Sequence, residues 1–400
     1  MTRPDIDLVN PDTYAQGGPP YDQFAWLREH APVFLHPGDP ATGYPQFWAV
    51  TRHEDVTQVS RHPELFSSHT RLALFDESSD DQLALQQMMM LNQDPPDHTR
   101  KRGFVNRGFT PRAIGLLEQH IRGIARELVD AVGPDADFVR DLAAPLPLYV
   151  ICELLGAPVE DREKIFNWSN KMIGFDDPEF QLTPEDGVTA AAAIYAYAHD
   201  LAEKRAADPR EDIVTRLLEP DNQGDRLSTD EFDLFVLLLM VAGNETTRNA
   251  ASGGMQAFFD HPDQWRRLLA DRSLARTGVD EIVRWVTPVN LFRRTATRDL
   301  ELRGQKIREG DKVVVFYSAA NRDEAVFADP DVFDIGRDPN PHLGYGGGGP
   351  HFCLGAHLAR MELRVLFETL AEVRPEISAR AAPRRLRSNF INGIKELSLK

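Results

Sequence analysis

The sequence has 400 residues, of which 42% are apolar, and it carries a formal net charge of −17 at pH 7. A chain of this length can bury a large core, and its acidic balance argues against a protein that binds nucleic acid. The apolar run over residues 235–242 is far short of the roughly 20 residues that cross a bilayer, and we expect neither a signal peptide nor a transit peptide. We therefore expect a cytoplasmic protein without a membrane span.

No internal repeat, low-complexity tract or long linker divides the chain, so we expect one domain over residues 1–400. Residues 21–30 have the pattern of a short helix. Two runs rich in β-branched and aromatic residues then flank a Gly/Pro-rich connection, which predicts a hairpin within residues 33–51.

The segment that follows the hairpin, residues 94–112, is basic within an acidic chain. His98 and Arg102 are four residues apart, so on a helix they share one face and reach toward one anionic group. Arg294 and His351 are candidates for the same anion through charge-assisted hydrogen bonds. The further basic residues of the segment are Arg100, Lys101, Arg107 and Arg112. The alternative is a solvated helix face without a ligand.

Apolar residues at 3.6-residue spacing predict helices over residues 113–132, 190–206 and 356–373. A second strand-rich segment is expected over residues 299–318, with alternation around Leu300 and Leu302. The expected fold class is therefore mainly α with small β-sheets.

Only two cysteines occur, Cys152 and Cys353, too few for a disulfide framework in a chain this long. Cys152 lies in the apolar helical run PLYVICELLG, where a free cysteine acts as a small hydrophobe. We expect it to be part of the core.

The longest expected helix begins at Ser228, which forms a capping-box pattern with Glu231, and continues to about Asp260. At 1.5 Å per residue it would be about 50 Å long, enough to cross the molecule. Its middle is apolar on all sides and must be buried.

Gly243, Glu245 and Thr246 interrupt this apolar stretch. A glycine costs roughly 1 kcal/mol against alanine in a helix interior, and a buried carboxylate costs more unless it is paired. Rules broken at one place point to a functional site. A carboxylate beside a hydroxyl can relay protons, so we assign Glu245 and Thr246 to catalysis. The alternative is that the Thr246 hydroxyl only bonds the carbonyl of Ala242, one turn back, and bends the helix.

Glu281 and Arg284 are three residues apart in DEIVRWVTP. At an exposed position such an ion pair contributes under about 1 kcal/mol. The neighbouring Ile282, Val283 and Trp285 indicate a largely buried helix, so we expect further hydrogen bonds to hold the pair.

The run GYGGGGPHFCLG, residues 344–355, surrounds Cys353 with glycines and ends where a helix begins. Glycine lets a backbone turn sharply or lie against a flat ligand. The unpaired N–H groups at the helix start favour a thiolate, which suits the axial ligand of an iron porphyrin. Zinc is the alternative, with His342, His351 and His357 nearby, but structural zinc sites usually combine more than one cysteine.

Taken in this order, these residues resemble those of the cytochromes P450, and the resemblance covers essentially the whole chain. AGNETT resembles the oxygen-binding segment of that family's central helix, EIVR its E-x-x-R motif, and GGGGPHFCLG its haem loop. HTRKR resembles the H-x-x-x-R that binds a haem propionate, and FDIGR would add Arg337 to Glu281 and Arg284 in a structural cluster. Each motif is weak alone, but five in sequence are specific.

One position departs from the family pattern. A phenylalanine usually stands seven residues before the cysteine, whereas this sequence has Gly346 there and Tyr345 one residue earlier. AGNETTRN, DEIVRWVTPV and LRSNFINGIKE are most similar to actinobacterial members that act on sterol side chains and branched lipids.

The resemblance implies the P450 fold, a helix-rich triangular prism with the long helix over the haem. It implies haem b with Cys353 as iron ligand, and a monooxygenase that inserts one atom of O₂ into a C–H bond while Glu245 and Thr246 deliver protons. Electrons would come from a ferredoxin and its reductase, with an acidic ferredoxin docking on residues 100–112. The other cofactor contacts would be His98, Arg102, Ala242, Gly243, Arg294, Gly349, His351 and Gly355.

Apolar residues near the expected haem predict an extended hydrophobic substrate. These residues are Leu72, Phe75, Met88, Met89, Met90, Val289, Leu291, Phe292, Phe390 and Ile391. Core packing is the alternative for each of them. We expect a sterol or steroid first, and a terpene or branched fatty chain second. A haem-thiolate peroxygenase and a non-catalytic haem carrier are the other function classes, although neither needs a carboxylate–hydroxyl pair.

Overall fold

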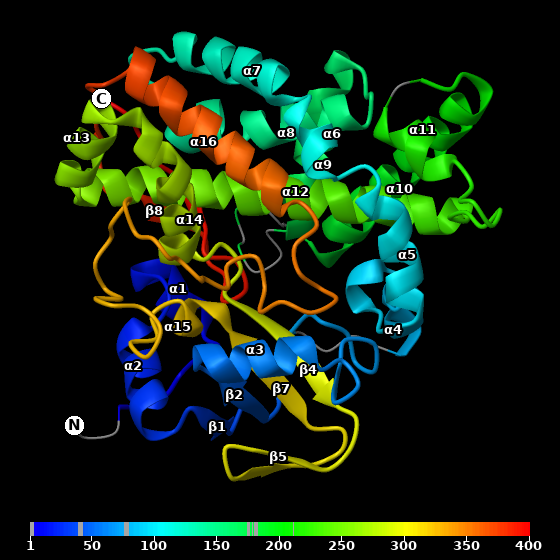
Figure 1. The fold of residues 1–400 in the computed structure, drawn as a ribbon, viewed down its shortest axis with the longest axis vertical. Helices are drawn as coiled ribbons and strands as arrows, with labels where there is room; N and C mark the ends of the chain where they lie inside the picture. Colours follow the sequence, from blue (N-terminus) through cyan, green and yellow to red (C-terminus); the bar gives the residue numbers. More distant parts are fainter. Residues whose placement is uncertain are drawn as a thin grey trace.

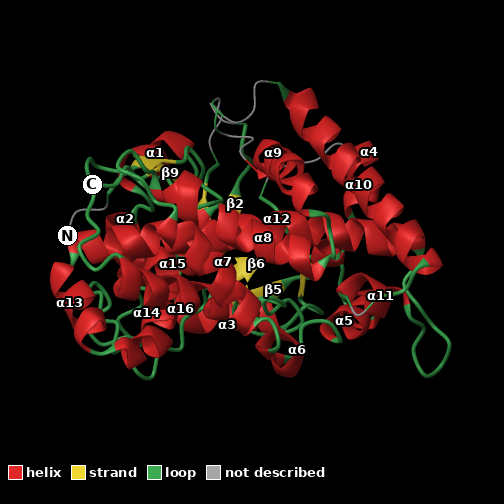
Figure 2. Cartoon of the chain, turned by 90° about the horizontal axis from the view of Figure 1, so that it is seen from above, coloured by secondary structure: helices red, strands yellow, loops and turns green. Residues whose placement is uncertain are grey.

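The computed structural model describes residues 4–38, 43–75, 80–173, 177, 179, 183–210 and 212–400. Helix α12 (Thr229–Asp260) crosses the molecule, and in Figure 1 α7, α8 and α16 lie above it while the largest sheet lies below it with α1, α2 and α3. Figure 2 shows α9 (Arg162–Ile173) and α10 (Pro184–Ala207) on one side of α12, and both helices contact it. Along the part of the chain that is described, no helix combines the length and the apolar character needed to cross a bilayer.

The other helices of the described residues follow in chain order. They are α1 (Pro11–Gly17), α2 (Tyr21–His30), α3 (His53–Arg61), α4 (Asp80–Gln86), α5 (Asp97–Asn106), α6 (Pro111–Gly115), α7 (Glu118–Asp130), α8 (Pro145–Leu154), α11 (Ile213–Leu218), α13 (Pro262–Ala270), α14 (Ala275–Val286), α15 (Tyr317–Ala320) and α16 (Ala356–Val373).

The strands form one sheet of five and two small hairpins. They are β1 (Val33–His36), β2 (Phe47–Val50), β3 (Phe66–Ser67), β4 (Leu291–Ala296), β5 (Leu300–Leu302), β6 (Gln305–Ile307), β7 (Lys312–Phe316), β8 (Arg384–Arg385) and β9 (Ile394–Glu396). The large sheet has the order β1-β2-β7-β4-β3, in which only β2 and β7 run parallel. All five residues of β7 are buried, which explains its nearly continuous apolar sequence KVVVF.

Several predicted elements are confirmed. The helix over residues 21–30 is α2, the helix over residues 356–373 is α16, and β1 pairs with β2 as the expected hairpin. The capping box of α12 is present, since Ser228 Oγ accepts a hydrogen bond from the Glu231 backbone N–H at 3.2 Å and Glu231 Oε2 accepts one from the Ser228 N–H at 2.9 Å. Cys152 is completely buried in α8, as expected for a core residue.

Two helix predictions differ from the structure. The helix expected over residues 113–132 is interrupted between α6 and α7, where Leu116 and Leu117 donate backbone hydrogen bonds three residues back. Gly115, a poor helix former, lies at this break. The helix expected over residues 190–206 begins earlier, at Pro184, because Thr183 and Asp186 form a capping box there. Proline is tolerated at the first position of a helix, so α10 can begin at Pro184.

Candidate cofactor and active site

One short stretch in the otherwise buried middle of α12 is not fully covered by protein. Ala242 is exposed, and Gly243 and Thr246 are half-buried, whereas residues 232–237 and 247–252 are buried. This face of α12 is therefore not covered by the protein's own side chains. A Cβ atom at Gly243 would lie 2.9 Å from Ile151 Cδ1 of α8, which gives this glycine a packing reason in addition to any ligand contact.

The Thr246 hydroxyl donates a hydrogen bond to the carbonyl of Ala242 at 2.7 Å. This is the bond that the sequence offered as the alternative to a catalytic role. A threonine that bonds one turn back tends to bend a helix, so the bond and the opening occur at the same place. The two interpretations are therefore compatible.

The Glu245 carboxylate is bound on another side of α12. Only 2% of this residue is exposed, and its Oε1 accepts hydrogen bonds from the Arg248 guanidinium and from Asn249 Nδ2, the latter at 2.8 Å. Arg248 Nη1 also donates to Asn170 Oδ1 of α9 at 2.8 Å. In the described structure, no hydrogen bond joins the Glu245 carboxylate to the Thr246 hydroxyl. Sequence reasoning missed Arg248 and Asn249, although their spacing of three and four residues from Glu245 marks them as its helix neighbours.

Cys353 lies at the end of the glycine-rich loop, and its side chain is not covered by other residues. Its backbone N–H donates to the Tyr345 carbonyl at 2.9 Å, and α16 begins three residues later. Figure 1 shows this loop below the middle of α12. A Cβ at Gly349, where φ is +73°, would lie 2.4 Å from the Ser60 carbonyl oxygen of α3. This glycine therefore makes room for the protein's own backbone, whereas Gly355 has open space around it.

The aromatic residue of the loop is displaced by one position but is still buried. Tyr345 is 8% exposed, with the Arg360 guanidinium carbon 4.3 Å from its ring centre and the His342 ring 5.4 Å away. Gly346 takes the position usual for phenylalanine and has φ of +98°. The aromatic side chain of this loop is thus supplied by Tyr345, one position before the usual phenylalanine.

The protein's own groups do not make Cys353 a thiolate. Desolvation inside the protein raises the pKa of its thiol, although the Gly355 backbone N–H and the charges of Arg102 and Arg360 act in the opposite direction. The helix start thus acts in the expected direction, but for the polypeptide alone desolvation is the larger effect. A cation in front of the sulfur is needed to stabilise the anion.

The structure brings His98, Arg102, Arg294 and His351 together. The rings of the two histidines are 4.3 Å apart, and His98 Nδ1 and His351 Nε2 are buried without a partner. Burial, helped by Arg102, lowers the pKa of His98 to about 4, and burial with Arg294 lowers that of His351 to about 2. Among the residues that the structure describes, no carboxylate pairs with Arg102 or Arg294. Two arginine cations beside unpaired ring nitrogens suit an anion.

These features fit an iron porphyrin. The Cys353 thiol is exposed, Ala242 leaves part of α12 uncovered, and the unpaired ring nitrogens of His98 and His351 lie beside Arg102 and Arg294, whose cations could bind the acidic groups of a ligand. Zinc is not supported, since the described part of the chain has no cluster of three potential metal-binding side chains.

Glu281 and Arg284 are completely buried in α14 and form two hydrogen bonds, of 2.7 and 2.8 Å. Arg337 Nε reaches the same carboxylate at 3.1 Å. Arg284 also donates to the backbone carbonyls of residues 321, 330 and 332. These bonds fasten the long loop before Cys353 to α14.

The apolar residues suggested for the substrate divide into two groups. Leu72, Phe75, Leu291 and Ile391 are at most 3% exposed, so they are packed against protein; Phe75 lies against Phe47 and Tyr44. The structure thus places these four in the core, the alternative that the sequence left open. Half-buried or exposed positions are occupied by Met88, Met89, Met90, Val289, Phe292 and Phe390. Sequence reasoning missed Val241 and Met172, which pack with Val289 and Phe390 around Ile391. Val241 directly precedes the exposed Ala242.

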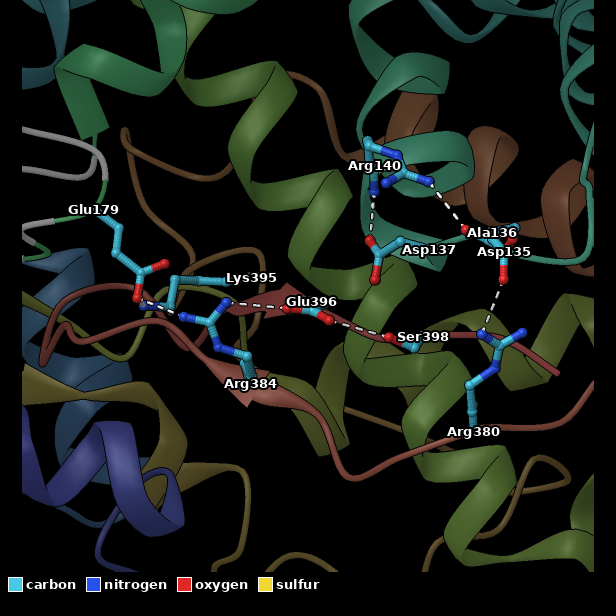
Figure 3. Close-up of a pocket in the computed structure, with 10 residues that line it drawn as sticks. All are labelled: Asp135, Ala136, Asp137, Arg140, Glu179, Arg380, Arg384, Lys395, Glu396 and Ser398. Carbon is cyan, nitrogen blue, oxygen red and sulfur yellow. Dashed lines mark hydrogen bonds and ion pairs between the residues drawn. The ribbon is translucent and has the colours of Figure 1, made fainter.

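A separate surface hollow lies at the carboxyl-terminal hairpin, lined by the ten residues labelled in Figure 3. Its cations are paired: Arg384 contacts Glu179 at 2.5 Å and Glu396 at 3.0 Å, and Arg380 contacts Asp135 at 3.1 Å. A hollow of balanced charges does not suit a hydrophobic ligand, so we place the candidate site at Cys353 and α12.

The chain matches the family model for cytochrome P450 over residues 41–373. It is 47% identical to a steroid C26-monooxygenase of Rhodococcus jostii, over 98% of this chain and 84% of that protein. It is 44% identical to a methyl-branched lipid omega-hydroxylase of Mycobacterium tuberculosis, over 98% of this chain and 94% of that protein. A solved Mycobacterium marinum cytochrome P450 in complex with pseudoionone has a TM-score of 0.92 and 38% identity, covering 100% of this chain and 99% of that one.

Proposed function

Because this chain belongs to the cytochrome P450 family, which consists of haem-thiolate monooxygenases, we propose that it hydroxylates a steroid at the end of its side chain. The expected family and fold are confirmed by the family model and by the solved P450 structure. The haem cofactor, O₂, a redox partner and a hydrophobic substrate follow from the same membership. When bound, the haem supplies O₂ activation and the insertion of oxygen into a C–H bond.

The observation that carries the proposal is that Cys353 is not covered by protein, while Arg102 of the basic group bonds the carbonyl of the preceding Phe352 at 2.6 Å. In this proposal Cys353 binds the iron, and the propionates are bound by His98, Arg102, Arg294 and His351. Residues 1–400 act as one monooxygenase domain.

Thr246 holds a proton at Oγ1 next to the open face of α12, where its bond to the Ala242 carbonyl fixes the hydroxyl. Glu245 supports this relay from a fixed position, since Arg248 and Asn249 hold its carboxylate. Both roles are general acid–base roles, which contribute about 100-fold or more to rate in other enzymes.

Two observations support a steroid. The half-buried apolar and methionine side chains near the open face of α12 suit an extended hydrophobic ligand. The Rhodococcus jostii relative, at 47% identity, is a steroid C26-monooxygenase, which suggests the terminal carbon of the side chain as the reacting position.

The test begins with the purified holoprotein. Reduced protein exposed to carbon monoxide is expected to show the absorption band of thiolate-ligated haem, and Cys353→Ser to lose it. Steroids with a full side chain are then expected to shift the spectrum of the ferric protein and to yield a product hydroxylated at the chain end. If steroids neither bind nor react while another lipid does, the steroid proposal is wrong and the enzyme class stands.

A methyl-branched lipid is the second candidate substrate, favoured by the 44% identity to the Mycobacterium tuberculosis omega-hydroxylase. A terpene is a weaker one. The same binding screen, run with steroids, branched fatty acids and terpenes in parallel, ranks them by affinity and product yield. Activity with hydrogen peroxide but never with a reductase system would instead indicate a peroxygenase, and binding without any product would indicate a carrier.

For the redox partner we propose a ferredoxin with its reductase. The docking surface is smaller than the sequence suggested, because Arg100 bonds Asp225 and Glu231 at 2.8 and 2.9 Å and Lys101 lies 3.5 Å from Glu231. The exposed side chains of Arg107 and Arg112 remain to attract an acidic partner.

A further inference from the structure

The helix that follows the cysteine loop carries an arginine that the proposed function does not use. Arg360 lies on α16, four residues after Ala356, the first residue of the helix, and seven after Cys353. At 1.5 Å per residue, four residues correspond to about 6 Å along the helix axis, or roughly one turn. The guanidinium therefore belongs to the end of α16 that adjoins the cysteine, and 32% of the side chain is exposed, so solvent screens its charge only in part.

Two contacts hold the Arg360 guanidinium in place. Its Nε donates to Asp280 Oδ1 of α14 at 2.7 Å, and its central carbon lies 4.3 Å from the centre of the Tyr345 ring. The Tyr345 carbonyl in turn accepts the Cys353 backbone N–H at 2.9 Å. The arginine is thus packed against the residue that bonds the backbone of the cysteine.

Asp280 provides a counter-charge for this arginine. His342 Nε2 lies 3.0 Å from Asp280 Oδ1, and the Gly344 backbone N–H donates to His342 Nδ1 at 3.1 Å. Because Nδ1 accepts this bond, the imidazole is neutral and its Nε2–H donates to Asp280. Desolvation opposes the Asp280 anion, but the His342 hydrogen bond and the charge of Arg360 outweigh it and lower the pKa of Asp280. The cluster therefore holds a positive charge on Arg360 and a negative charge on Asp280.

The positive charge of Arg360 acts on the cysteine sulfur. Desolvation raises the pKa of the Cys353 thiol, and the charges of Arg102 and Arg360 oppose it by stabilising the thiolate. In the proposed function Arg102 binds a propionate, whose negative charge offsets much of its effect on the sulfur. Arg360 is paired instead with an aspartate of the protein, so its effect is fixed by the fold.

Such a charge changes how readily the bound haem accepts an electron. Reduction by the redox partner adds one electron, and with it one negative charge, to the haem and its sulfur ligand. A fixed positive charge nearby stabilises the reduced state and raises the reduction potential, whereas a negative charge lowers it. Groups outside the first ligand shell are one of the means by which proteins adjust the potential of a haem.

We propose that Arg360 raises the reduction potential of the haem by acting on the Cys353 sulfur, and that Asp280 limits this effect by offsetting the charge. Asp280 and the Tyr345 ring hold the guanidinium beside the cysteine loop. Arg360 is a positioning residue that acts through the sulfur, and its role rests on Cys353 as the iron ligand of the proposed function.

A spectroelectrochemical titration of the substrate-free holoprotein tests this role without turnover. In Arg360→Gln, the ratio of reduced to oxidised haem at a fixed applied potential is expected to fall about fivefold, because a positive charge is lost. Arg360→Lys keeps the charge and should stay close to the original protein. Asp280→Asn removes the counter-charge, so it should shift the ratio in the opposite direction.

Arg364→Gln is the matched control, since Arg364 lies one turn further along α16 and pairs with Glu118 and Glu368. It is expected to leave the ratio unchanged. A purely structural role would lower stability in both Arg360→Gln and Asp280→Asn without moving their potentials in opposite directions. Equal potentials in Arg360→Gln and the original protein, or shifts of the same sign in the two variants, would overturn the proposal.

The carbon monoxide spectrum separates this proposal from the proposed function. If the original protein lacks the band of thiolate-ligated haem, the iron ligand is wrong and the role of Arg360 fails with it. If the band is present and the potentials do not move, only the role of Arg360 fails. Should Arg360→Gln not retain haem, Asp280→Asn decides, because an unchanged or lowered potential in that variant refutes the role.

Discussion

The Thr246 hydroxyl can take part in proton delivery or only shape α12, and removing it tests whether proton delivery depends on it. Thr246→Ala removes the proton-holding group along with the bond to the Ala242 carbonyl. We expect the variant to keep its haem and to consume NAD(P)H while forming about tenfold less product per electron pair, because proton delivery is impaired. Thr246→Ser keeps the hydroxyl and should stay close to the original protein. Tightly coupled turnover in Thr246→Ala would show that the hydroxyl only shapes the helix.

Glu362 makes stability depend on pH in a predictable direction. Burial raises the pKa of its carboxyl group to about 8, so the folded protein keeps this proton up to about pH 8, whereas an unfolded chain loses it near pH 4.5. Between these values the folded state binds more protons, so raising the pH lowers stability, by about 1.4 kcal/mol per pH unit. Urea unfolding measures the free energy of unfolding of the holoprotein and of Glu362→Gln between about pH 5 and pH 9, a range that spans the two pKa values. The stability difference between the two proteins should stop changing above pH 8. A difference that does not depend on pH would contradict a raised pKa of Glu362.

Single residues also show how far sequence reasoning reaches. The pairing of Glu281 with Arg284 could be predicted from the residues, because the two have helix spacing and apolar neighbours that indicate burial. The contribution of Arg337 was expected only from the family resemblance. The contacts of Glu245 with Arg248 and Asn249 were missed, although their helix spacing is visible in the sequence. The bond from Arg248 to Asn170 of α9 could not be predicted, since Asn170 is distant in the chain. Likewise, the sequence alone could not separate Phe75, a core residue, from the half-buried Phe292, because both are aromatic residues in apolar surroundings.

Among the elements, the glycine-rich loop before α16 places the cysteine, and its fit against α3 can be tested. Gly349→Ala introduces a Cβ atom 2.4 Å from the Ser60 carbonyl oxygen at a φ of +73°. Gly310 has a similar φ of +84° but open space around it, so Gly310→Ala measures the backbone strain alone, about 1–2 kcal/mol. We expect Gly349→Ala to lose clearly more stability and to retain less haem. Equal losses in the two variants would show that the contact with α3 is unimportant.

The elements themselves were predictable to different degrees. Helix α12 was found with both ends because it has a capping box, a continuous apolar run and a proline after its end. The break between α6 and α7 was missed, since the apolar spacing continues through Gly115 and a glycine alone does not end a helix. Motifs fixed by local backbone geometry were thus visible in the sequence, whereas breaks decided by packing were not.

At the scale of the whole molecule, the proposed docking of an acidic redox partner depends on the exposed Arg107 and Arg112 near α5. Reversing both charges, Arg107→Glu with Arg112→Glu, should slow reduction by an acidic ferredoxin about tenfold at low salt, and the difference should shrink as salt is added. Arg276→Glu changes an exposed charge on α14, which lies apart from α5 in Figure 1, and is expected to have little effect. Stopped-flow reduction measures all three proteins. Equal rates at low salt would exclude this docking surface.

The four basic residues that suit the propionates come from α5, from β4 and from the loop before α16. A dianionic ligand held by all of them joins segments that are far apart in the chain, so part of its binding free energy becomes folding free energy. In newly made polypeptide, binding of the porphyrin would then compete with degradation of the chain. The amount of mature enzyme in a cell would follow the supply of haem as well as the rate of synthesis of the chain.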